Sequence, residues 1–267
     1  MNLLRSYGRL LDINPYEFEP VYFGLNHFGW FKHLYDKQGK DWVPAIRDYV
    51  KVNGFIPADA EQRDQSWLDT YAMVEQMLND FPEYLPNTYL QYYFYPEYKA
   101  SLQNIEHTRA NEVMDGREKR VFSECKQVVK QRNSKGTSVV QNDAHGDMIV
   151  EVAECIAYNC NRQYIVIVPN EGFIENIDSS AMVEVTAVLG NNGPRPLGVG
   201  SVSTFYKGLI EQQNAYEQLT CEAYFEGSYM KALQALTMNR TIVDAKKARK
   251  ILDDLIEANK EFWPNLK

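Results

Sequence analysis

Residues 19–35 have the sequence EPVYFGLNHFGWFKHLY, in which aromatic and β-branched side chains are frequent. Such side chains favour extended backbone, whereas glycine and asparagine favour turns. We therefore expect one strand from Glu19 to Asn26 and a second from Trp30 to Tyr35, followed by a turn at residues 36–39. This stretch predicts that the chain is built around a pair of strands.

Helices are expected on both sides of these strands, because apolar residues recur there at helical spacing. The ranges are a short N-terminal helix and residues 42–53, 59–80, 108–131, about 148–156, 205–237 and 243–262. A further strand is expected over residues 164–168, and residues 182–189 and 197–202, which bracket the turn-rich segment 190–194, are expected to form a hairpin or a paired loop. Residues 87–95 fit either a strand or a buried helix. Because the strands cluster and do not alternate strictly with helices, the predicted fold class is α+β, formed as a single domain over residues 1–267.

The composition narrows the class of protein. The 267 residues can bury a sizeable core, and a net charge of −8 without a long basic run argues against a nucleic-acid surface. A membrane span is not expected, because the longest aliphatic run covers only residues 165–168. A secretory signal is not expected either, because residues 1–18 lack an apolar core and a cleavage site. The four cysteines form no CxxC pair, so reduced thiols in a cytoplasmic protein are the simplest interpretation.

Familiar catalytic motifs are missing from this sequence. The segment GVGSVS at residues 198–203 lacks the third glycine of a dinucleotide-binding loop, and a hairpin turn is expected there. His27 and His33 are six residues apart, which is not a metal-binding spacing on a helix. The residues alone therefore predict an α+β domain without a defined site.

A series of segments does resemble a known family. The segment GLNHFGW at residues 24–30 is similar to the metal-binding signature of family 4 glycoside hydrolases. Further matches follow in the family's order: LPNTYLQYY (85–93), HTRANEVM (107–114), MVEV (182–185), GPRPL (193–197) and EANKEFWP (257–264). Within that family, the sequences of these segments resemble those of the branch that cleaves 6-phospho-α-glucosides such as maltose 6-phosphate.

The resemblance implies a fold like the domain that follows the nucleotide-binding domain in lactate and malate dehydrogenases. It also implies a reaction in which NAD⁺ oxidises the sugar at C3, a base removes the acidified C2 proton, the C1 substituent leaves and water adds before the hydride returns. A divalent ion such as Mn²⁺ is expected at the C2 and C3 oxygens. The substrate implied is a phosphorylated disaccharide.

Four residues take on roles through this resemblance. His27 matches the histidine metal ligand and Tyr89 matches the base, which needs a nearby positive charge to lose its proton near neutrality. Arg109 matches a residue that holds the 6-phosphate or neighbouring hydroxyls, and Asn26 is expected to bond sugar hydroxyls. The other readings stay open: Tyr89 as a core aromatic, Arg109 as a solvated side chain in the first turn of its helix, and His145 as either a helix cap or a residue near the pocket.

The chain departs from the family pattern upstream of His27. No glycine-rich nucleotide-binding segment and no cysteine metal ligand precede His27. The expectation is therefore that this is the C-terminal, substrate-side portion, that its NAD site and N-terminal Rossmann domain are absent, and that it is inactive alone. A separately encoded N-terminal half and a homo-oligomer are the partners expected. The alternatives are a sibling specificity (6-phospho-β-glucosidase or α-galactosidase) and a non-catalytic fragment that only oligomerises.

Overall fold

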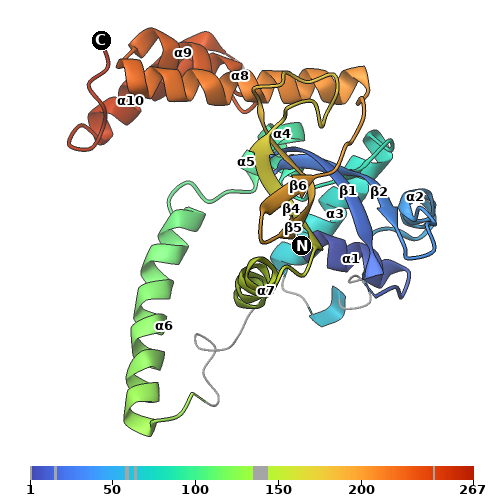
Figure 1. Cartoon of the computed structure of the whole chain (residues 1–267). Helices are drawn as coiled ribbons and strands as arrows, with labels where there is room; N and C mark the ends of the chain where they lie inside the picture. Colours follow the sequence, from blue (N-terminus) through green and yellow to red (C-terminus); the bar gives the residue numbers. More distant parts are fainter. Residues whose placement is uncertain (1, 15–16, 58–59, 63–64, 135–143, 243) are drawn as a thin grey trace. The chain divides into compact units, whose positions relative to one another are not determined.

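The computed structural model describes residues 2–14, 17–57, 60–62, 65–134, 144–242 and 244–267 (Figure 1). The chain divides into two compact units. The first comprises Met1–Pro96, Gln163–Val188 and Pro194–Lys267, and the second comprises Glu97–Arg162 and Leu189–Gly193. The α+β class is confirmed, and a single domain over all 267 residues stays a prediction.

The first unit is organised around the predicted pair of strands. Strands β1 (Glu19–Leu25) and β2 (Phe28–Tyr35) pair antiparallel, with Gly24 opposite Gly29, and β3 (Leu85–Pro86) pairs with the other edge of β2. Side chains on both faces of β1 and β2 are largely buried, because the aromatic residues that make these segments extended also form the core. The prediction of two strands here is confirmed.

Helices cover this sheet. They are α1 (Asn2–Leu10), α2 (Val43–Asn53) and α3 (Gln65–Asp80). Tyr7 of α1 packs edge-on against Phe31, and its hydroxyl donates to the carbonyl of Pro86 at 3.1 Å. Helix α2 is followed by Gly54, whose φ of 76° is a value that glycine adopts more readily than other residues and whose N–H donates to the carbonyl of Val50. Residues 58–59 and 63–64, where the third helix was expected to begin, lie outside the described residues.

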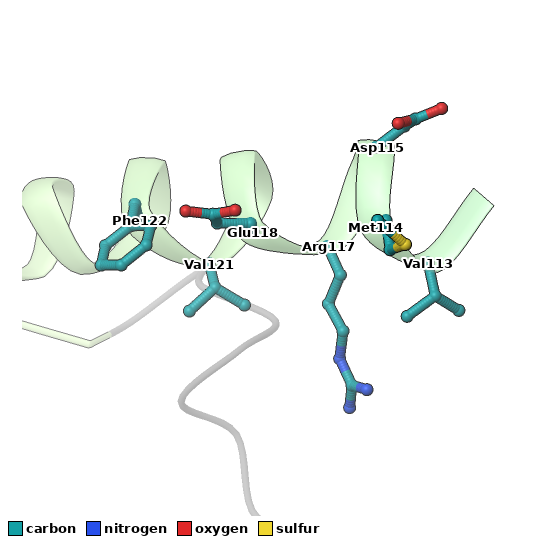
Figure 2. A pocket seen from close by; sticks show the side chains of 7 residues that line it. All are labelled: Val113, Met114, Asp115, Arg117, Glu118, Val121 and Phe122. Atoms are coloured by element: carbon teal, nitrogen blue, oxygen red, sulfur yellow. The ribbon is translucent and has the colours of Figure 1, made fainter. Parts of the chain in front are cut away.

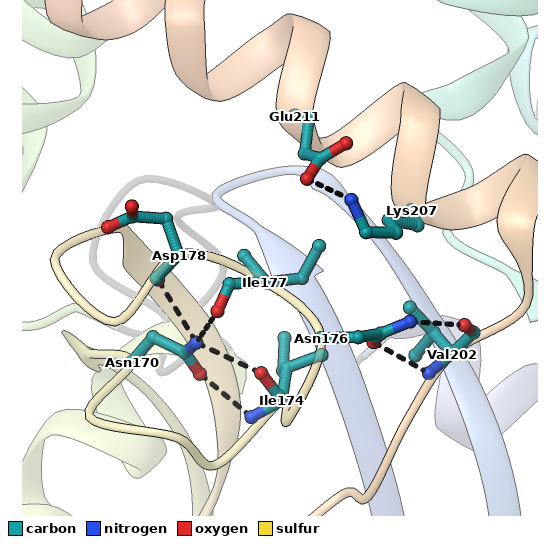
Figure 3. Close-up of polar contacts among 8 residues, drawn as sticks. All are labelled: Asn170, Ile174, Asn176, Ile177, Asp178, Val202, Lys207 and Glu211. Carbon is teal, nitrogen blue, oxygen red and sulfur yellow. Dashed lines mark hydrogen bonds and ion pairs between the residues drawn. The ribbon is translucent and has the colours of Figure 1, made fainter.

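A second sheet contains β4 (Arg162–Pro169), β5 (Met182–Gly190) and β6 (Gly193–Pro196), in the order β4-β5-β6. The hydroxyl of Thr186 on β5 joins it to the first sheet: it accepts from the backbone N–H of Tyr22 at 3.1 Å and donates to the carbonyl of Pro20 at 2.7 Å. The loop after β4 is held by the buried amide of Asn170, which bonds the backbone of Ile174, Ile177 and Asp178 (Figure 3).

The C-terminal part differs from expectation. Two helices were predicted over residues 205–262, but the described part of this region contains three: α8 (Thr204–Glu226), α9 (Tyr229–Met238) and α10 (Ala245–Ala258). The single helix predicted over residues 205–237 is wrong because Gly227 adopts φ 66° and ends α8, after which the Ser228 side chain caps α9. Pairing across the turn-rich segment at 190–194 is present, but its second arm is β6 and not residues 197–202, which lie in a loop.

The second unit contains α6 (Arg109–Gln131) and α7 (Ala144–Tyr158). The side chain of Thr108 caps α6, as the predicted start of that helix requires. The short helices α4 (Leu90–Phe94) and α5 (Pro96–Ser101) precede it, so residues 87–95, which fitted either a strand or a helix, are largely helical. Among the described residues, no helix is both long and apolar enough to cross a bilayer.

Candidate active site

The turn between β1 and β2 presents His27 to solvent. Asn26 and His27 occupy the turn and are exposed, while the flanking Leu25 and Phe28 are fully buried. His27 has φ 61°, a left-handed conformation that few non-glycine residues adopt. The turn is narrow: a Cβ at Gly24 would lie 2.3 Å from the carbonyl oxygen of Phe28, so only glycine fits there.

Tyr89 lies beside this turn. Its ring stacks on the imidazole of His27, with 4.4 Å between the ring centroids and 11° between the planes. The side chain of Tyr89 remains 47% exposed, so it is not a core aromatic. Its backbone N–H donates to the side-chain oxygen of Asn87 at 3.0 Å, immediately before α4 begins. The structure thus brings together two of the four predicted site residues.

A polar cluster lies beneath the stacked pair. The side-chain N–H of Asn87 donates to the hydroxyl of Tyr22 at 3.1 Å, and the backbone N–H of Asn87 donates to the carbonyl of Gly29 at 3.0 Å. The Tyr22 hydroxyl and the backbone N–H of His27 both donate toward the carboxylate of Glu184 on β5. The side chains of Tyr22 on β1, Glu184 on β5 and Asn87 therefore lie next to the backbone of His27 and Tyr89.

Burial dominates the electrostatics of this cluster. Removal from solvent raises the pKa of Glu184, and hydrogen bonding from Tyr22 and from the His27 N–H opposes that rise. Burial, followed by the charge of Glu184, raises the pKa of Tyr22 well above its usual value. Tyr22 therefore stays a neutral hydroxyl that accepts from Asn87 and donates to Glu184.

The other predicted site residues are placed less completely. Asn26 is exposed next to His27 in the turn. Arg109 is exposed at the first position of α6, in the second unit, so its distance from His27 is not defined. The side chain of His145 lies outside the described part of the chain. A surface shared by His27, Tyr89 and Arg109 stays a prediction.

His27 fits a metal ion as one ligand of a larger site. Its imidazole is solvent-exposed at a tight turn, and imidazole nitrogen binds first-row divalent ions well. The described residues contain no group of three or more histidine, cysteine, aspartate or glutamate side chains that could hold a metal. The described chain therefore offers one ligand and not a complete coordination sphere.

The segment at residues 198–203 is a loop between β6 and α8, so the hairpin turn expected there is wrong. The amine of Lys32 on β2 donates to the carbonyls of Val199 and Ser201 at 2.8 and 3.0 Å, which fixes this loop against the first sheet. Its role in this structure is to connect the second sheet to α8.

Tyr22, Asn87 and Glu184 were not singled out as site residues from the sequence. Asn87 and Glu184 fall inside segments that resemble the family, but Tyr22 and Asn87 are 65 positions apart. No local pattern pairs residues over that separation. Only the three-dimensional arrangement of β1, β3 and β5 shows that they support His27 and Tyr89.

Comparison with known proteins identifies the class to which this fold and site belong. Residues 22–242 match the family 4 glycosyl hydrolase C-terminal domain, and the chain belongs to this family of enzymes. It is 51% identical over 249 residues to the maltose-6'-phosphate glucosidase of Fusobacterium mortiferum, an alignment that covers 92% of this chain and 56% of that protein.

Solved structures agree with this assignment. A 6-phospho-alpha-glucosidase from gut microorganisms in complex with NAD and Mn²⁺ has a TM-score of 0.92 and 55% identity, covering 100% of this chain and 61% of that one. Another, in complex with NAD and glucose-6-phosphate, has a TM-score of 0.90 and 40% identity, covering 99% and 60%. The chain thus spans less than two thirds of the length of these relatives.

Proposed function

We propose that this chain supplies the sugar-binding side of a 6-phospho-α-glucosidase that acts on substrates such as maltose 6-phosphate. The observation that carries this proposal is the stacked pair of His27 and Tyr89, in a domain similar over 92% of its length to a maltose-6'-phosphate glucosidase. The match to a structure complexed with NAD and glucose-6-phosphate supports the phosphorylated sugar as substrate.

The chemistry assigned to this chain is proton transfer. Tyr89 removes the proton from C2 of the sugar, because its phenol is exposed at the site and its backbone is fixed by Asn87. His27 holds Mn²⁺ as one ligand through the exposed imidazole. When bound, NAD supplies a hydride acceptor for C3 and Mn²⁺ supplies positive charge at the neighbouring sugar oxygens.

Binding of the phosphorylated sugar is assigned to two further residues. Arg109 grips the 6-phosphate, since a planar guanidinium can donate two parallel hydrogen bonds to phosphate oxygens. Asn26, exposed beside His27, bonds sugar hydroxyls. Both assignments follow the family resemblance, and each is testable by substitution.

The remaining parts of the proposal concern the NAD site, the oligomeric state and the location of the protein in the cell. We assign NAD binding to a part of the protein outside the described residues, supplied either by the same gene or by a separate one, and expect the chain to be inactive without it. We also propose a homo-oligomer. A cytoplasmic location fits the four cysteines, which are all free thiols.

The experiment combines this chain with the portion of the Fusobacterium relative that it does not cover, in the presence of NAD⁺ and Mn²⁺. Release of glucose 6-phosphate from maltose 6-phosphate supports the proposal. Parallel assays with 6-phospho-β-glucosides and with α-galactosides test the sibling specificities. Cleavage of either of those substrates, without cleavage of maltose 6-phosphate, would overturn the α-glucoside assignment.

A further inference from the structure

Four hydrogen bonds converge on Asn87. Its backbone N–H donates to Gly29 at 3.0 Å, and its carbonyl accepts from Leu90 at 3.1 Å. Its side chain accepts from the N–H of Tyr89 at 3.0 Å and donates to Tyr22 at 3.1 Å. One residue therefore links β1, β2 and the start of α4.

This link lies where the sheet ends. The β2–β3 ladder ends at the pair formed by Trp30 and Pro86, and one further main-chain bond, from the N–H of Asn87 to the carbonyl of Gly29, follows it. Tyr89 is consequently not held to the hairpin by strand pairing. The side chain of Asn87 supplies a second connection, because its oxygen accepts from the N–H of Tyr89 and its N–H group donates to Tyr22 on β1.

The Tyr22 end of this connection is itself rigid. Tyr22 is 2% exposed, and a Cβ at Gly29 would lie 2.6 Å from its hydroxyl oxygen, so glycine at that position makes room for the hydroxyl. The hydroxyl also faces Glu184, which in turn receives the N–H of His27. The same small cluster thus contacts the backbone of both stacked residues.

We propose that Asn87 is a positioning residue that holds the ring of Tyr89 against the imidazole of His27 by anchoring the Tyr89 turn to Tyr22. This inference rests on the proposed function insofar as Tyr89 acts as the base. Asn87 touches neither sugar nor cofactor in this role. It acts by fixing the position of the phenol ring of Tyr89.

The test uses NMR on the 267-residue chain, without cofactors. Cross-relaxation between the ring protons of His27 and Tyr89 reports the stacking, and hydrogen exchange reports the Tyr89 amide. The variants are Asn87→Ala, which removes both side-chain bonds, and Tyr22→Phe, which keeps the ring and removes only the hydroxyl. The matched control is Asn176→Ala: Asn176 is also half-buried, and its amide bonds the N–H and carbonyl of Val202 at 3.0 and 2.7 Å (Figure 3).

The expected result is loss of the ring cross-peaks in Asn87→Ala, with exchange of the Tyr89 amide faster by roughly tenfold, as for loss of one hydrogen bond. Tyr22→Phe should weaken the cross-peaks, and Asn176→Ala should leave them intact. Should Asn87→Ala fail to fold, Tyr22→Phe decides alone. Unchanged cross-peaks in Tyr22→Phe, or equal losses in the Asn176 control, would overturn the proposal.

An assay of the assembled enzyme separates this inference from the proposed function. If Asn87 positions the base, Asn87→Ala lowers kcat and leaves KM nearly unchanged. Intact stacking that depends on Asn87, in an assembly that cleaves no phosphorylated glucoside, would refute the proposed function alone. Full kcat in Asn87→Ala, with cleavage present, would refute the positioning role alone.

Discussion

The rings of His27 and Tyr89 lie 4.4 Å apart and within 11° of parallel, although the two residues are far apart in the sequence. The imidazole and the phenol are both exposed to solvent. Positive charge at or near the imidazole would stabilise a phenolate on its stacked neighbour. The contact therefore joins the residue proposed to hold the metal with the residue proposed to move the proton.

The first prediction concerns Tyr89. In the assembled enzyme, Tyr89→Phe should lower kcat by about two to four orders of magnitude, the usual contribution of a general base, while substrate affinity changes little because the ring is kept. Loss of deuterium exchange at C2 of the sugar is the direct measurement. Tyr224→Phe, at a tyrosine that is 61% exposed on α8, is the control and should exchange normally. Normal exchange in Tyr89→Phe would assign the base elsewhere.

The second prediction concerns metal binding. His27→Ala should weaken Mn²⁺ binding by the assembly at least ~10-fold, since even supporting residues of metal sites contribute that much. Electron paramagnetic resonance of free Mn²⁺ measures the affinity. His33→Ala is the control, because His33 is engaged with Asp41 through a 2.7 Å contact and lies outside the site. Equal affinities for the two variants would remove His27 from the coordination sphere.

The third prediction concerns Arg109. Arg109→Ala should raise KM for maltose 6-phosphate by about tenfold or more, as expected when a charged hydrogen-bonding group is removed, and should change kcat less. Arg109→Lys should fall between, because lysine keeps the charge and loses the planar geometry. Arg120→Ala, an exposed arginine on the same helix, should behave as the unaltered chain does. If the Arg109 and Arg120 variants have the same KM, Arg109 does not bind the phosphate.

Local patterns account for what the sequence could predict. The hairpin around His27 was predictable because aromatic strands flank a short turn, and the start of α6 because Thr108 and Asn111 form a capping pair. The break between α8 and α9 was missed because Gly227 and Ser228 lie inside an otherwise helical run. Residues 87–95 gave no decision, since a short apolar run fits a buried strand or a helix equally well.

The site required more than local pattern. His27 and Tyr89 were predicted as site residues only through resemblance to a family. That resemblance did not predict that their rings are in contact. The support from Asn87 and Tyr22 depends on how β3 pairs with β2, which fixes residues 65 positions apart. Such pairings are decided by the packing of the whole core, so a single sequence does not reveal them.

The fourth prediction concerns stability and pH. Burial raises the pKa of Glu217 on α8, and a hydrogen bond from Gln213 opposes the rise. Because the folded pKa exceeds the unfolded one, ionised Glu217 costs stability above its folded pKa, and the cost vanishes below the unfolded pKa. Glu217→Gln should therefore raise the free energy of unfolding at about pH 7 by up to about 1 kcal/mol, with no gain below about pH 4.

Thermal unfolding followed by circular dichroism at several pH values measures this difference. The control is Glu211→Gln on the same helix, since Glu211 is exposed and pairs with Lys207 (Figure 3). Removing an exposed ion pair should change stability little or lower it slightly. A stability gain in Glu217→Gln that persists unchanged at low pH would contradict burial of the charge as its cause.

The last prediction concerns self-association through α6. A groove along this helix is lined by the apolar side chains of Val113, Met114, Val121 and Phe122 and by the charged ones of Asp115, Arg117 and Glu118, and Phe122 is 58% exposed (Figure 2). If this face is an oligomer contact, Phe122→Asp should shift the chain toward monomer, because a carboxylate would be desolvated there. Light scattering measures the mass. Gln127→Asp is the control: it adds the same charge five residues later, on a different side of the helix, and should keep the oligomer. If the unaltered chain is a monomer at high concentration, the contact does not exist.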